Sequence, residues 1–114
     1  MDRFQKGLET MKEYVTADAL KQMVESDALA DIAPDLRKMI VEFAYGDIYS
    51  RDGLGKKKRA LVVITAVVTQ GAAPQTKTHI TRGLQAGLTP KEIVEALLQM
   101  VPYIGFPRVQ NALT

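Results

Sequence analysis

The segment at residues 56–70 limits what this chain can fold into more than any other part of the sequence. The apolar side chains in its run RALVVITAVVTQ cover nearly every direction around a helix. The β-branched residues favour a strand, whereas the length, the basic start and the helical segments that follow favour a helix, which we predict. A helix that is apolar all round must be buried on all sides. In a chain of 114 residues, this burial is easiest inside an oligomer.

The rest of the chain has apolar residues at helical spacing and none of the alternation typical of strands. We therefore expect one all-α domain over residues 1–114, with about six to seven helices. Thr16 and Asp18 can cap the second helix, and Pro34 suits the first position of the third. The predicted apolar stripes of the first helix, over residues 2–15, and of the third contain Phe4, Leu8, Met11, Val15, Leu36, Ile40, Phe43, Ala44 and Ile48.

Strong boundary signals mark the helices of the second half. A helix is predicted from residues 72–74 to about Gln85, with Gly87 as the left-handed residue that ends it. Thr89 and Glu92 form a predicted capping box at the start of the next helix. Pro102 is expected to kink or end that helix, and a last short helix is expected over residues 108–113.

Composition and charge exclude several classes of protein. The chain has no cysteine, which excludes disulfides, thiolate metal sites and thiol chemistry. Residues 1–50 carry a net charge of −4 and residues 51–114 a net charge of +6. That basic surplus is small and lacks interleaved aromatic residues, so we expect no nucleic-acid partner. Since no apolar run spans a bilayer and no signal-peptide pattern opens the chain, we expect no membrane association and a cytoplasmic location.

His79, the only histidine, lies in the middle of a predicted helix. Gln75 and Arg82 lie about one turn before and after it, on the same stripe. Ile80 and Leu84 form another stripe, which we expect to face the core. The polar stripe then either meets solvent or lines a cleft with a neighbour. A lone histidine is more often a surface or structural residue than a ligand, so the residues alone leave both interpretations open.

Residues 36–113 resemble the carboxymuconolactone decarboxylase family, whose superfamily also contains the AhpD-like alkylperoxidases. The resemblance is carried by YSRDGL at residues 49–54, the helices with Arg59 and His79, GLTPKEIVEALLQ, and YIGFP followed by NA. It implies an all-α fold and a ring-like homo-oligomer, usually a hexamer built as a trimer of dimers. Residues 1–33 then form N-terminal helices ahead of the family core.

The resemblance also separates two kinds of chemistry. The alkylperoxidase branch uses a glutamate, two cysteines and a histidine, which fall here at Ala60, Ala72, Gln75 and His79. Only the histidine is retained, and a thiolate is the nucleophile in such reactions. We therefore expect no thiol peroxidase activity.

The decarboxylase branch resembles this chain better, and it implies a carboxy-lyase that needs no cofactor or metal. Its substrate is a small unsaturated carboxylate or lactone, in which the electrons left by carbon dioxide delocalise. His79 is the predicted catalytic acid, because the pKa of a histidine lies near the working pH. Cations suit carboxylate binding. The predicted substrate-binding residues are Arg59, Arg82, Gln75 and Tyr103.

Alternatives remain for several of these residues. Arg59 could instead form a partly buried ion pair with Asp47 or Asp52, and Tyr103 could pack in the core. Lys77 is a further candidate carboxylate ligand, but its position off the His79 stripe favours an exposed side chain.

The function itself also has an alternative. The branch leads us to expect an acidic residue near position 75, where this chain has Gln75. That difference favours a non-catalytic, oligomeric small-molecule-binding protein on the same scaffold.

Overall fold

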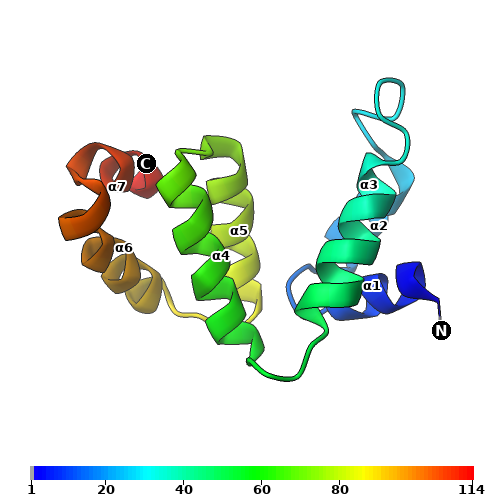
Figure 1. Cartoon of the computed structure of the whole chain (residues 1–114), viewed down its shortest axis with the longest axis horizontal. Helices are drawn as coiled ribbons and strands as arrows, with labels where there is room; N and C mark the ends of the chain where they lie inside the picture. Colours follow the sequence, from blue (N-terminus) through cyan, green and yellow to red (C-terminus); the bar gives the residue numbers. More distant parts are fainter. Residues whose placement is uncertain (1) are drawn as a thin grey trace. The chain divides into compact units, whose positions relative to one another are not determined.

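The computed structural model of the chain describes residues 2–114, and this range is helical, with no β-strand (Figure 1). The predicted all-α fold is therefore confirmed. The described chain forms two compact units, one ending at Leu54 and one over Gly55–Thr114. The helices are α1 (Arg3–Met11), α2 (Ala17–Glu25), α3 (Leu36–Met39), the π-helix η1 (Ile40–Tyr49), α4 (Lys56–Gln70), α5 (Ala73–Gln85), α6 (Pro90–Ile104) and α7 (Phe106–Leu113).

In the first unit, two glycines allow α1 and η1 to pack closely. A methyl group on Gly7 would overlap the main-chain carbonyl of Val41. A methyl group on Gly46 would lie 2.8 Å from the carbonyl oxygen of Arg3. An ion pair also joins α1 to η1, because Nη2 of Arg3 lies 2.6 Å from Oδ2 of Asp47. That guanidinium lowers the pKa of the Asp47 carboxyl through the hydrogen bonds it donates.

A cluster of three tyrosines completes the core of the first unit. Tyr45 and Tyr49 stack with ring centroids 4.1 Å apart, and Tyr14 meets Tyr49 edge-on at 5.0 Å. Tyr14 and Tyr45 are each 2% exposed. Aromatic pairs in these orientations add to the stabilisation that burial already provides.

The third helix differs from the sequence-based prediction. It begins at Leu36 rather than Pro34, and from Ile40 onward it is a π-helix. A π-helix pairs residues i and i+5, so its turn is wider and a 3.6-residue stripe no longer stays on one side. The core-facing residues are Val41 and Tyr45. The predicted stripe is wrong at four positions that are 40–60% exposed, namely Leu36, Ile40, Phe43 and Ile48.

The first helix is shorter than predicted. Thr16 caps α2 as predicted, because its hydroxyl accepts a hydrogen bond from the N–H of Ala19. The first helix ends at Met11 rather than Val15, and the second ends at Glu25.

In the second unit, α4 and α5 form an antiparallel hairpin (Figure 1). The helix predicted over residues 56–70 is confirmed, and Gly71 ends it in the left-handed conformation, with φ of 70°. Its buried stripe is Ala60, Ile64 and Val68. The expected burial on all sides is not met within this chain, because Val62 is 57% exposed.

The start of α6 follows the sequence signals closely. The N–H of Glu92 donates to Thr89 Oγ1 at 3.0 Å, and the N–H of Thr89 donates to Glu92 Oε1 at 2.9 Å. The predicted capping box is therefore confirmed. Pro102 does not end the helix, which continues to Ile104; Gly105, with φ of 89°, then makes the break. The last helix accordingly starts at Phe106 rather than at residue 108.

We predict that Gly7→Ala destabilises the protein although alanine is the better helix former. The added methyl would meet backbone of η1, which cannot rotate away as a side chain can. Overpacking of this kind lowers the free energy of unfolding by about 1–3 kcal/mol. Gly53→Ala is the matched control, since nothing lies within 4 Å of a methyl group there. Equal denaturant midpoints for the two variants would contradict the packing described.

Candidate functional site

His79 lies on the side of α5 that packs into its own unit. Thr76, Gly83 and Ala86 are buried, and they lie three residues before, four after and seven after His79. The His79 side chain is half-buried. The expectation that Ile80 and Leu84 face the core is therefore wrong for Leu84, which is 43% exposed. The buried stripe of α5 consists of small residues rather than large apolar ones.

The small residues follow from the close approach of α4 to α5. A methyl group on Gly83 would lie 3.1 Å from Cδ1 of Ile64 and 3.7 Å from Cβ of Ala60. At these distances the Ile64 side chain would have to move by a few tenths of an ångström to admit a methyl group one turn along α5 from His79. His79 lies on the same side of α5 as Gly83, and its side chain is partly removed from water.

Burial and a neighbouring cation both act on the imidazole. Desolvation is the larger cause, and the positive charge of Arg82 adds to it; together they lower the pKa of His79 from 6.5 to about 4. Both effects disfavour the imidazolium form. His79 is consequently neutral near pH 7, and its free ring nitrogen can accept a proton.

The other predicted site residues differ in their burial and in the helix on which they lie. Arg82 is half-buried on α5, close enough to His79 to act on its charge. Arg59 is half-buried in the first turn of α4 and precedes Ala60, which lies opposite Gly83. Gln75 is exposed on α5, and Tyr103 is 81% exposed near the end of α6. The α4–α5 hairpin therefore carries all of these residues except Tyr103.

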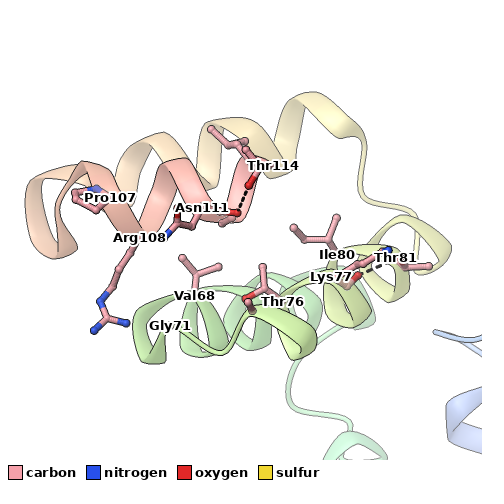
Figure 2. A pocket seen from close by; sticks show the side chains of 13 residues that line it. Val68, Gly71, Thr76, Lys77, Ile80, Thr81, Pro107, Arg108, Asn111 and Thr114 are labelled. Carbon is pink, nitrogen blue, oxygen red and sulfur yellow. Dashed lines mark hydrogen bonds between the residues drawn. The ribbon is translucent and has the colours of Figure 1, made fainter.

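A groove of about 810 Å³ lies on another side of α5, against α7 and the end of α4 (Figure 2). Lys77 and Ile80 of α5, Arg108 and Asn111 of α7, and Val68 of α4 contribute to its walls. His79 does not line it. Sequence reasoning missed this groove, although the spacing of residues 73, 76, 77, 80 and 81 already places them on one face of a helix.

The described residues contain no group of three potential metal-ligating side chains. Over the same part of the chain, no helix combines the length and apolarity needed to cross a bilayer.

Comparison with protein families gives a match over most of the chain. The family described as "Carboxymuconolactone decarboxylase family" matches residues 34–114. This range contains all of α3 to α7 and η1, and so includes the hairpin with His79.

Three relatives extend the similarity over nearly the whole chain. An uncharacterized 15.0 kDa protein of Paracoccus denitrificans is 32% identical over 96% of this chain and 84% of its own length. A 4-carboxymuconolactone decarboxylase of Acinetobacter baylyi is 29% identical, over 97% and 81%. A nitrosuccinic acid decarboxylase of Metarhizium robertsii is 27% identical, over 96% and 76%.

The depressed pKa of His79 predicts a pH dependence of stability. As the pH falls from about 6.5 to about 4, the unfolded chain takes up a proton on His79 that the folded chain does not. Acidification over this window therefore lowers the free energy of unfolding. We expect a smaller loss in His79→Gln, measured by denaturant unfolding at several pH values. NMR titration of the imidazole provides the direct check, and a pKa of 6.5 in the folded protein would contradict the burial described.

Proposed function

Because the chain belongs to the carboxymuconolactone decarboxylase family, we propose that it decarboxylates a small carboxylic acid without a cofactor, with His79 as the proton donor. The observation that carries this proposal is the half-buried, neutral imidazole beside Arg82. Perturbed pKa values of this kind cluster at functional sites.

The reaction requires a leaving group, an electron acceptor and a proton. The bond between the substrate carbon and its carboxylate breaks, and carbon dioxide leaves without the bonding electron pair. That pair delocalises into an acceptor group of the substrate. The imidazolium of His79 then donates its proton to the carbanion carbon, and the neutral imidazole takes up a new proton from solvent.

Binding of the substrate would itself bring His79 into the protonated form that the reaction needs. In the free protein, Arg82 and burial hold the pKa of His79 at about 4. A bound carboxylate would offset the charge of Arg82 and raise that pKa, because an anion favours the imidazolium. The proton is thus acquired when there is a substrate to receive it.

The names of two relatives support an acid that carries an electron acceptor. One acts on 4-carboxymuconolactone and the other on nitrosuccinic acid. An unsaturated lactone and a nitro group can both delocalise the electron pair left by carbon dioxide. For this chain we propose a small unsaturated carboxylate or lactone. Arg59 and Arg82 would bind its carboxylates, while Gln75 and Tyr103 would donate further hydrogen bonds.

We propose that Tyr103 takes part in this scheme from a second copy of the chain. It is 81% exposed and lies outside the hairpin. We propose a homo-oligomer, a hexamer arranged as a trimer of dimers, in which such residues reach a neighbouring His79. Exposed apolar side chains on several elements support an association of this kind: Leu36, Phe43, Val62, Leu98 and Phe106.

Light scattering tests the oligomer. We expect a mass near six times the chain mass of 12.6 kDa. Association would remove the exposed apolar side chains from water, which is favourable. A folded species of one chain mass at micromolar concentration would contradict the proposal.

His79→Ala tests the catalytic role. We expect the oligomer to persist and carbon dioxide release from 4-carboxymuconolactone, or from a related lactone acid that the wild type accepts, to fall by about 100-fold or more. Gln85→Ala is the matched control, since Gln85 is exposed on the same helix and lies on another side of it. Unchanged release from His79→Ala would refute the assignment. No release from the wild type with any lactone acid would favour the binding-protein alternative.

A further inference from the structure

The groove between α5 and α7 has the chemistry of a ligand site separate from His79. Its volume of about 810 Å³ falls within the range of small-molecule pockets, roughly 300–1,000 Å³. Val68 and Ile80 give it an apolar middle (Figure 2). Pockets of this kind use a few polar groups to fix the orientation of an otherwise apolar ligand.

The charged side chains that line the groove, Lys77 and Arg108, are both cationic. Figure 2 places Arg108 beside Gly71 at one end and Lys77 beside Thr81 at the other. None of the described residues that line the groove is Asp or Glu. A cationic side chain at each end favours an anionic ligand.

The position of Arg108 depends on Gly71. The Arg108 guanidinium lies so close to Gly71 that a methyl group there would overlap Nη1. Gly71 also has φ of 70°, which L side chains rarely adopt. The turn that ends α4 thus leaves space for the guanidinium at this end of the groove.

We propose that this groove binds an elongated organic dianion, with an apolar middle against Val68 and Ile80 and a carboxylate at each end. Arg108 binds one carboxylate and Lys77 the other, and Asn111 offers an amide to the same ligand. The site does not rest on the proposed function, because His79 does not line it and lies about 200° around α5 from Lys77.

Octanedioate is a suitable probe, compared by calorimetry with octanoate and with 1,8-octanediol. We expect the dianion to bind the full chain most tightly and more weakly as salt is added. Lys77→Gln and Arg108→Gln should each weaken its binding about tenfold, as expected for lost hydrogen bonds to a charged group. Lys91→Gln on α6 is the matched control, because it removes the same charge from an exposed residue that does not line the groove.

Methyl NMR of the unmodified protein gives a second, independent test. Octanedioate should shift the methyl signals of Val68 and Ile80, and His79→Ala should bind it as the wild type does. The proposal is overturned if octanedioate fails to bind, if Lys91→Gln weakens binding as much as the groove variants do, or if His79→Ala abolishes binding. Absence of shifts at Val68 and Ile80 would overturn it equally, and that result would also follow if a second copy filled the groove.

Discussion

The close packing of α4 against α5 is the contact on which the candidate site depends. It is possible because Gly83 offers no side chain where Ile64 and Ala60 approach to 3.1 and 3.7 Å from the position of its missing Cβ. His79 lies one turn away on the same side of α5, and burial is the main reason for its depressed pKa. A larger residue at position 83 would have to displace the side chains of Ile64 and Leu88. The chemical character of His79 is therefore a consequence of helix packing more than of a charged neighbour.

Local signals in the sequence predicted the helices well wherever both partners of an interaction lie within a few residues. Thr89 and Glu92 cap α6 through mutual hydrogen bonds three residues apart, so the motif alone specified that boundary. The same holds for Thr16 at α2 and for Gly87, whose positive φ is possible because glycine has no side chain. The resemblance to the decarboxylase family added the hairpin as a candidate site, and the family match over residues 34–114 includes it.

Side-chain placement was less predictable because it depends on packing between distant segments. A period of 3.6 predicts the stripe with Leu36 and Phe43, but the chain there winds as a π-helix and directs Val41 and Tyr45 inward. On α5, the sequence predicts large apolar residues on the core side, whereas Gly83, which α4 approaches closely, and Ala86 are buried. The groove was not predictable for the same reason: Lys77 and Arg108 line one groove only through the fold, and each alone resembles an ordinary surface cation.

Helix α5 thus presents two different environments on two of its sides. Toward α4 it holds a neutral imidazole, where burial and Arg82 suppress positive charge. Toward α7 it presents Lys77, an exposed cationic side chain that lines the groove. We propose that an anion binds on both sides, but for different reasons. Beside His79 it would change a protonation state, because it relieves the field of Arg82. In the groove it would only neutralise fixed charges and bury its apolar middle. Proton uptake that accompanies ligand binding is therefore a property that separates the two sites, since it belongs to the His79 side alone.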